Sequence, residues 1–489
     1  MDANGILQKH WMAVASRFAL DAVIFVLAFV LGTYHRLGDE STIWLMSYWP
    51  GILIGSMVFA CACYTFGLYS PQNANQEMFK RSLTLAFCVS VAIALMLGIF
   101  YLKFSTRIGR GVMLRSGAIT YLGVFIHHAL LVRRLRFYRE RVAFIVTSVF
   151  DESETGMFEA LGSRNLELVG LVTDNDYQPR GTMKVLGRVQ DLPTIVEREN
   201  LVRVLCTNTS IKDPTLYRHF CQLRYSGIPV MPLIGLCEEV YQCVPLELVS
   251  PEWLLNASGS PHLLYIKKIK RGFDIAVALA GIFFLGPALL FGMVLVRLTS
   301  PGSIIYRQTR GGRFGQPFEM FKLRTMGVDA EKDGAVWSPQ NDPRVTPVGR
   351  FLRKYRIDEI PQLFNVLRGE MSFVGPRPER PEFFNELARQ VPLFQERLMV
   401  QPGITGWAQV NYPYGATVDD TRRKLEFDLY YMKNMSLFLD LFILLDTVRI
   451  ILRGGLDEAS KKNAPHYAAI QEWGRRRDKL PVDDALANR

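Results

Sequence analysis

Four long apolar stretches near the start of the chain constrain its fold more than any other sequence feature. They cover residues 18–34, 43–69, 83–102 and 111–132. A helix of about 20 residues crosses a hydrocarbon core of roughly 30 Å, and each stretch comes close to that length or exceeds it. We therefore predict that residues 1–141 form a bundle of four transmembrane helices.

Basic residues predict the orientation of this bundle. Lys80 and Arg81 lie between the second and third stretches, and five arginines occur within residues 133–141. Because lysine and arginine concentrate on the cytoplasmic side of membrane proteins, both ends of the bundle are expected there. Three basic residues on the opposite side violate this pattern: Lys103, Arg107 and Arg110. Asp21 is the only acidic residue within the stretches, so we expect an anchor rather than an ion pathway.

The formal net charge of +11 indicates acidic partners. We interpret it as attraction to an anionic membrane surface and to phosphorylated substrates, and not to nucleic acid, because no nucleic-acid recognition motif accompanies the charge. The seven cysteines have no spacing typical of disulfides or paired metal sites, which predicts reduced thiols facing a cytosol.

The pattern changes after residue 141. Four short runs rich in β-formers alternate with helical stretches, which predicts a parallel Rossmann-like α/β domain over residues 142–250. These runs cover residues 142–149, 166–172, 202–207 and 228–233. The first run continues into Asp151 and Glu152 without a glycine, so close approach of a dinucleotide phosphate is not expected. Residues 251–264 are predicted to be a linker.

A fifth apolar stretch, residues 275–296, has basic residues on both sides and Gly286-Pro287 in its middle. Both ends should therefore face the cytoplasm, and the proline should interrupt the helix. The 12 residues before the break would rise only about 18 Å, too little to cross. We predict a re-entrant helix over about residues 272–298 that breaks at Pro287. An ordinary kinked spanning helix is the alternative.

Residues 265–455 contain neither histidine nor cysteine. Thiolate nucleophiles, imidazole bases and histidine-based zinc sites are therefore excluded from this block. The carboxylates, cations and hydroxyls that it does contain suit phosphoryl transfer assisted by Mg²⁺.

Three polar clusters stand out in this block. One contains Lys322 and Arg324, and another is a Gly-Pro-Arg-Pro turn around Arg377. The third has Arg350, Arg353 and Lys354 at helical spacing, followed by Asp358-Glu359, where Asp358 resembles a helix N-cap before Pro361 and Gly369. Each cluster alone is typical of a cap, a solvated helix face or a loop; their occurrence together behind a broken membrane helix favours a phosphate site.

Residues 265–455 resemble the bacterial sugar transferase family, the monotopic phosphoglycosyl transferases. The whole chain resembles the large subfamily, with four membrane helices, an α/β domain and a mainly α catalytic domain. The motifs that carry the resemblance are Lys270-Arg271-Gly-Phe-Asp274, Phe321-Lys-Leu-Arg-Thr-Met326, Asn341-Asp-Pro-Arg-Val-Thr-Pro-Val-Gly349, Asp358-Glu-Ile-Pro-Gln-Leu363, Met371-Ser-Phe-Val-Gly-Pro-Arg-Pro378 and Pro402-Gly-Ile-Thr-Gly-Trp-Ala-Gln-Val-Asn411. Gly286-Pro287 departs from the family, whose helix break is commonly Ser-Pro.

The resemblance implies transfer of a sugar 1-phosphate, glucose or galactose, from a UDP-sugar to undecaprenyl phosphate, with release of UMP. Asp358 would form a covalent phosphosugar intermediate, and Glu359 would help to bind Mg²⁺. The basic residues that would bind substrate phosphates are Lys322, Arg324, Arg353, Arg377, Lys270 and Arg271.

The same resemblance implies a location and an assembly. The enzyme would lie in the bacterial inner membrane, with its catalytic domain on the cytoplasmic face, and would form a homodimer. It would catalyse the first membrane step of exopolysaccharide, capsule or O-antigen synthesis. Residues 437–452 are expected to lie in the membrane interface, and residues 456–489 to be a solvated, mobile tail.

Two alternatives remain open on the sequence. One is a membrane sensor or scaffold whose α/β domain binds a ligand and whose C-terminal block is inactive. The other is a transferase whose active site lies within the bundle, which would need acidic loops at the membrane face. Residues 1–141 contain only scattered acidic residues.

Overall fold

The computed structural model describes residues 3–65, 68, 78–102, 109–137, 140–146, 166–173, 184–206, 214–258, 262–330, 332, 342–413, 415 and 417–453. The predicted tail, Lys103, Arg107 and the segment after the first strand lie outside these residues. The chain divides into two compact units, Met1–Arg139 and Glu140–Arg489, and each is described by itself.

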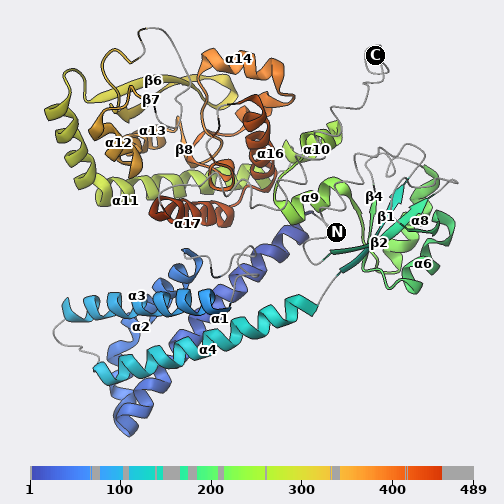
Figure 1. Ribbon diagram of the computed structural model, residues 1–489, viewed down its shortest axis with the longest axis horizontal. Helices are drawn as coiled ribbons and strands as arrows, with labels where there is room; N and C mark the ends of the chain where they lie inside the picture. The colour runs from blue at the N-terminus through green and yellow to red at the C-terminus, as the bar shows by residue number, and fades with distance from the viewer. Residues whose placement is uncertain are drawn as a thin grey trace. The chain divides into compact units, whose positions relative to one another are not determined.

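The first unit contains four long helices at the positions of the four apolar stretches: α1 (Ala3–Leu37), α2 (Ser41–Thr65), α3 (Met78–Leu102) and α4 (Arg110–Phe137), with the short turn η1 (Gly38–Glu40) after α1. Helices α1 and α3 each pack against α2 and α4 (Figure 1). Among the described residues, two helical segments are long and apolar enough to cross a membrane, Ala15–Tyr64 and Lys268–Thr299. A shorter apolar helix covers Ser82–Ala94.

Asp21, the acidic residue of the first apolar stretch, joins α1 to α4. Its side chain is fully buried, and its two oxygens lie 2.9 Å from His127 Nδ1 and 2.8 Å from His128 Nε2. A buried carboxylate is costly unless it is paired, so both imidazoles lower the cost of placing it between these helices. The same two helices approach closely at Gly32, where a Cβ would lie 2.2 Å from the Ser116 hydroxyl oxygen.

The second unit begins with a five-stranded parallel sheet of order β3-β2-β1-β4-β5. Its strands are β1 (Glu140–Val146), β2 (Leu166–Thr173), β3 (Val185–Arg188), β4 (Arg203–Cys206) and β5 (Val230–Pro232). Four of them coincide with the predicted strand runs, and β3 was not predicted. The predicted mixture of helices and strands is confirmed.

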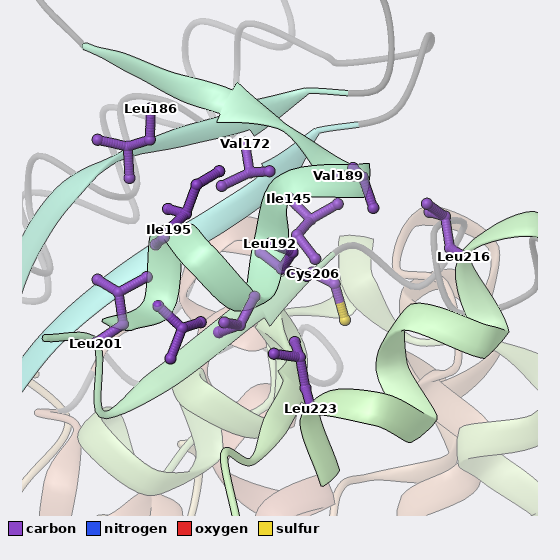
Figure 2. Close-up of a cluster of buried hydrophobic side chains, with 13 residues drawn as sticks. Ile145, Val172, Leu186, Val189, Leu192, Ile195, Leu201, Cys206, Leu216 and Leu223 are labelled. Atoms are coloured by element: carbon purple, nitrogen blue, oxygen red, sulfur yellow. The ribbon is translucent and has the colours of Figure 1, made fainter. Parts of the chain in front are cut away.

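Helices on one face of this sheet complete its core. Side chains from β1, β2, β3 and β4 converge on α6 (Leu192–Arg198) and α8 (Pro214–Tyr225), as Figure 2 shows. Ile145, Val172 and Leu192 are each fully buried there. Their removal from water accounts for the stability of this layer, at about 1.5–3 kcal/mol for each large aliphatic side chain.

The predicted linker, residues 251–264, is mostly helical, which corrects that prediction. The sheet is followed by α9 (Leu233–Tyr241), η4 (Leu246–Leu248) and α10 (Pro251–Ser258), and the next helix already begins at His262. Glu238 on α9 explains why these helices pack together, because its carboxylate accepts hydrogen bonds from Trp253 Nε1 at 2.7 Å and from Lys433 Nζ at 2.7 Å. These bonds hold α9 and α10 against α16 (Val418–Asn434).

The remainder of the unit carries the predicted chemical block. Its first part contains α11 (His262–Thr299), the hairpin of β6 (Ile305–Gly311) and β7 (Pro317–Leu323) with η5 (Arg313–Gly315) at its turn, α12 (Pro347–Lys354), η6 (Ile357–Glu359) and α13 (Gln362–Arg368). Its second part contains β8 (Ser372–Val374), α14 (Pro381–Gln390), η7 (Phe394–Met399), β9 (Gly403–Thr405), α15 (Trp407–Asn411), α16 and α17 (Leu437–Arg453).

Helix α11 continues through Pro287 instead of breaking there. In Figure 1 its ribbon changes direction in its second half, and the helix is bent rather than interrupted. Its first half packs through Ala278 against β7 and α13, and its second half packs through Val296 against β7 and α12. Both halves therefore contact the same body of the protein, which leaves the aromatic rings of Phe283 and Phe284 near the bend exposed.

Helix α17 has one buried and one exposed side. Leu439 and Ile443 are buried, whereas Leu441 and Val448 are exposed. Asp440 lies within residues 437–452, which were expected to lie in the membrane interface, and it is fully buried in an ion pair with Lys270. The acidic residue thus fastens α17 to α11.

Candidate functional site

The site is built on the end of β7 and on α12. The N-cap residue of α12 is Thr346, whose hydroxyl accepts a hydrogen bond from Gly349 N at 2.9 Å. A Cβ on Gly349 would lie 2.0 Å from Thr325 O, so only glycine lets α12 approach the chain after β7 this closely. Leu352 then packs on Leu323 in the core. The turn that carries Asp358 and Glu359 follows the end of α12.

Asp358 and Glu359 lie in η6, the single turn between α12 and α13. Arg356 enters this turn in the left-handed region, with φ 56°, a conformation that is rare outside glycine and is often found at functional sites. The prediction that Asp358 is a helix N-cap is wrong: Pro361 occupies that position, because the turn of η6 leads directly into α13. The predicted end of the helix at Gly369 is confirmed, since Gly369 follows α13 with φ 82°.

Glu359 lies at the centre of the site, and three cations surround its carboxylate. Lys322 Nζ is 3.3 Å and Arg377 Nη2 is 3.1 Å from Glu359 Oε1, and Arg356 Nη1 is 3.5 Å from Oε2. Burial opposes the ionisation of Glu359, but these cations outweigh it and hold its pKa well below the usual range. Glu359 therefore stays ionised. The predicted clusters around Lys322 and around Arg377 meet at its side chain.

Asp358 has a different environment, although it is the next residue. It is 6% exposed, and its Oδ1 accepts no hydrogen bond from any described residue. Burial, and then the negative charge of Glu359, raise its pKa above the ordinary value of an aspartate, while Lys322 and two arginines oppose the shift. The result is a desolvated carboxylate oxygen without a partner, which is the state expected of a nucleophile.

Two more predicted residues contact this region differently. Arg353 Nε donates to Thr325 Oγ1 at 2.9 Å, and its charge is among those that act on Asp358. Arg324 does not bond to either carboxylate; its Nη2 donates to Ser300 O at 2.9 Å, at the end of α11. The predicted cluster of Lys322 and Arg324 is divided by the end of β7, because the strand ends at Leu323 and Arg324 lies beyond it.

Lys270 and Arg271, also predicted to bind phosphate, hold helices together. Lys270 Nζ is 2.5 Å from Asp440 Oδ2, within a buried pair. Arg271 donates to Val366 O at 2.5 Å and to Leu367 O at 2.8 Å, the carbonyls at the end of α13. A guanidinium at a helix C-terminus satisfies carbonyls that have no partner within the helix. Both residues therefore fasten α11 to the helices beside it.

The turn that carries Arg377 depends on close backbone packing. Residue Gly375 follows β8, and a Cβ there would lie 2.3 Å from Gln401 O. From the other side, Arg397 Nη2 donates to Arg377 O at 3.0 Å and lies 3.1 Å from Asp428 Oδ2. Sequence reasoning missed Arg397 and Asp428, because the contacts join η7 to α16, segments that are far apart in the sequence.

Arg310 is a third residue that the sequence interpretation missed. It lies on β6, and its Nη1 donates to Pro378 O at 3.1 Å, directly after Arg377. The alternation of Tyr306, Gln308 and Arg310 would have placed all three on one face of a strand. That alternation was the available signal.

Two oxygens of the site fit a hard cation. Asp358 Oδ1 accepts no hydrogen bond from the described residues, and Glu359 Oε2 has only the 3.5 Å contact with Arg356. Mg²⁺ commonly takes one or two carboxylates and completes its shell with water and substrate phosphate oxygens. The donor set at this turn is therefore compatible with Mg²⁺, whereas the nearby cations suit phosphate oxygens.

Comparison with known proteins identifies relatives for this arrangement. The profile of a family described as bacterial sugar transferase matches residues 265–454. A UDP-N-acetylgalactosamine-undecaprenyl-phosphate N-acetylgalactosaminephosphotransferase from Aeromonas hydrophila is 41% identical over 289 residues, which are 58% of this chain and 67% of the relative.

Two further relatives are similar to parts of this chain. A putative undecaprenyl-phosphate N-acetylgalactosaminyl 1-phosphate transferase from Bacillus subtilis is 52% identical over 130 residues, 27% of this chain and 73% of the relative. A UDP-glucose:undecaprenyl-phosphate glucose-1-phosphate transferase from Caulobacter vibrioides is 41% identical over 253 residues, 51% of this chain and 91% of the relative. The names of all three proteins describe transferases that use undecaprenyl phosphate.

Proposed function

Because this chain belongs to the bacterial sugar transferase family, we propose that it transfers a sugar 1-phosphate from a UDP-sugar to undecaprenyl phosphate and releases UMP. The observation that carries the proposal is the unlike environment of two adjacent carboxylates. Asp358 has a buried oxygen without a partner, and Glu359 is ionised among three cations. One carboxylate is suited to attack phosphorus, and the other organises the charges around it.

The reaction has two displacements at the same phosphorus. In the first, Asp358 Oδ1 attacks the β-phosphorus of the UDP-sugar, the bond to the bridging oxygen breaks, and UMP leaves with that oxygen. The sugar phosphate is then held on Asp358 as an acyl phosphate. In the second, a phosphate oxygen of undecaprenyl phosphate attacks this phosphorus, and the Asp358 carboxylate is regenerated. The product is a sugar diphospholipid, and no proton needs to be stored on the protein.

Charge neutralisation is the main contribution of the other residues. Lys322 and Arg377 donate hydrogen bonds to Glu359 Oε1. When the donor sugar nucleotide binds, they can donate to its phosphate oxygens instead. Arg353, fixed by Thr325, adds positive charge beside Asp358. Glu359 would help to hold Mg²⁺, which when bound supplies further neutralisation of the pyrophosphate. Arg324, Lys270 and Arg271 we assign to holding α11 in place, because their donors already bind other groups.

The membrane arrangement forms part of the proposal. We propose that α1–α4 span the bacterial inner membrane and that α11 is a re-entrant helix whose ends both face the cytoplasm. The support is that both halves of α11 pack on one body and leave Phe283 and Phe284 exposed at the bend. A nucleotide sugar would then reach Asp358 from the cytosol, and the lipid phosphate would reach it from the membrane surface.

The donor sugar, the assembly and the pathway are also proposals. We propose a glucose- or galactose-type sugar, since relatives are named for glucose and for N-acetylgalactosamine. We further propose that the parallel sheet belongs to a Rossmann-like domain, that two chains form a homodimer, and that the product enters exopolysaccharide, capsule or O-antigen synthesis.

The test is UMP release by the full chain in nanodiscs with undecaprenyl phosphate, across UDP-glucose, UDP-galactose and their N-acetylated forms. At least one donor should release UMP, and Asp358→Asn should abolish it. If no donor releases UMP while the protein remains folded and binds a ligand through its α/β sheet, the sensor or scaffold interpretation replaces this one. A version of the chain beginning at residue 262 distinguishes the third interpretation, because catalysis within the bundle would not survive that truncation.

A further inference from the structure

Arg310 is a half-buried cation whose hydrogen bonds all go to neutral groups. Its Nε and Nη2 donate to Gln308 Oε1 at 3.0 and 2.5 Å, and its Nη1 donates to Pro378 O at 3.1 Å. Within the described residues no carboxylate lies at ion-pair distance from it. Glu379, the acid that acts on it most, already lies 3.5 Å from Arg397. A desolvated guanidinium without an anion is costly, which indicates that an anion arrives with a ligand.

The strand register places Arg310 on the same side of the hairpin as the catalytic lysine. Residues directly opposite each other in an antiparallel pair share a face, and Lys322 is opposite Tyr306, while Phe318 is opposite Arg310. Because Tyr306 and Arg310 are four residues apart on β6, all of these side chains point to one face. It is the inner face, because Phe318 is buried against α11 and α13.

Arg310 is also connected to the site through the turn after β8. Its partner Pro378 follows Arg377, the residue that donates to Glu359 at 3.1 Å. Arg310 therefore bonds to the turn beside Arg377 and lies on the hairpin face that carries Lys322. The charge of Arg310 acts on Lys322, whereas the cations that act on Asp358 most strongly are Lys322, Arg353 and Arg356. Lys322 bonds directly to Glu359, whereas Arg310 is opposite Phe318, four residues along β7 from Lys322, so Arg310 lies farther along the hairpin from the carboxylate turn.

The side chain of Arg310 is oriented before any ligand binds. Gln308 Nε2 donates to the Tyr306 hydroxyl at 3.1 Å, which turns the carbonyl oxygen of Gln308 toward Arg310. A guanidinium has five N–H groups, and three of them make the bonds described above. Two N–H groups remain for an acceptor, and phosphate oxygens match the geometry of such a planar fork. A fixed fork also loses little conformational entropy when it binds.

We propose that Arg310 binds the phosphate that leaves with the nucleotide, the α-phosphate of the donor and the single phosphate of UMP. This inference rests on the proposed function, which puts the β-phosphorus beside Asp358. In an in-line displacement the leaving group lies on the far side of phosphorus from the nucleophile. Arg310 lies on the same hairpin face as Lys322 but farther from Asp358, where the leaving phosphate would be. Gln308 and Tyr306 act as positioning residues for this contact.

The experiment compares binding of UMP and uridine to the full chain by calorimetry in nanodiscs. Arg310→Gln should weaken UMP binding about tenfold to a hundredfold, the value of one charge-assisted contact, and leave uridine binding unchanged. Arg310→Lys keeps the charge without the fork and should give an intermediate loss for UMP alone. Arg307→Gln is the matched control, because Arg307 lies on the opposite face of the same strand, is 67% exposed in its side chain, and should change neither affinity.

Three results would overturn the inference. Equal losses for UMP and uridine would mean that Arg310 only supports the turn at Pro378. An unchanged UMP affinity in Arg310→Gln would mean that the phosphate binds elsewhere. If Arg310→Gln does not fold, an unchanged UMP affinity in Arg310→Lys contradicts the proposal in the same way. A wild-type chain that binds neither UMP nor uridine and releases no UMP from any donor would refute the proposed function itself.

Discussion

Asp358 and Glu359 are consecutive residues of one helical turn, yet their surroundings shift their pKa values in opposite directions. Burial and the charge of Glu359 raise the pKa of Asp358, whereas Lys322, Arg377 and Arg356 overcome burial and lower that of Glu359. Paired groups whose environments separate their pKa values are typical of sites that assign them different roles. Here Glu359 makes direct contacts with three cations, whereas Asp358 Oδ1 accepts no hydrogen bond from the residues that the structure describes.

The first prediction concerns the acid side of the pH profile. Asp358 must be ionised to attack, and its pKa lies above the ordinary 3.8. The value of kcat/KM should therefore fall about tenfold per pH unit as the pH drops below that raised pKa. Glu359 stays ionised in this range, so a single proton should account for the fall. The measurement is UMP release against pH, and a flat profile down to the ordinary aspartate pKa in a folded enzyme would contradict it.

Glu359→Gln is expected to weaken both the fold and the reaction. The substitution leaves Lys322 and Arg377 without their carboxylate, and losing one partner of a buried pair costs about 3–5 kcal/mol. Because the side chain of Arg377 is 39% exposed and can turn to water, we expect about 3 kcal/mol. The free energy of unfolding in detergent checks this. Glu319→Gln, which removes an exposed partner of Arg307, should change it by less than about 0.5 kcal/mol.

Arg397→Met should lower activity by releasing the Arg377 turn. It removes the bond to Arg377 O and leaves Asp428 buried without its cation. Burial already raises the pKa of Asp428 to about 6, against the opposing charge of Arg397. The double variant Arg397→Met, Asp428→Asn should lose less free energy of unfolding than the sum of the losses in the two single variants, by about 0.5–3 kcal/mol. Strict additivity in a double-mutant cycle would show that this pair is not coupled.

The variant Lys270→Met tests whether Lys270 stabilises the fold through Asp440 or binds phosphate, as its sequence motif suggested. Asp440 would remain buried without Lys270, so the free energy of unfolding should fall by about 3–5 kcal/mol. The affinity of the folded variant for UMP should be unchanged. Lys322→Met is the comparison that should lower the kcat for UMP release. A tenfold loss of UMP affinity in Lys270→Met would restore the phosphate role.

Local pattern predicted the helices, because apolar stretches depend on neighbouring residues, and the family motifs indicated the residues around Glu359. The four apolar stretches became α1–α4, and Asp358-Glu359 meets Lys322 and Arg377 as expected. Partners from distant segments could not be predicted. Lys270 binds Asp440, 170 residues away, and Arg271 binds the end of α13, so basic residues that looked alike in sequence have different roles.

Two local predictions failed for conformational reasons. Asp358 resembled an N-cap, but the left-handed Arg356 starts a turn that carries Asp358 inward before α13 begins. Pro287 was expected to end its helix, but the helix bends because both halves find packing partners on β7 and the helices after it. In each case tertiary packing determined the backbone conformation, which local sequence alone did not determine.

The most direct test of the account is mass spectrometry of the full chain mixed with its UDP-sugar and no lipid acceptor. The account predicts a sugar phosphate on the peptide that contains Asp358, which disappears when undecaprenyl phosphate is added. Asp358→Asn should form no adduct and should turn over at least about a thousandfold more slowly. An active preparation that never carries the adduct, together with an Asp358→Asn variant that keeps its turnover, would contradict it.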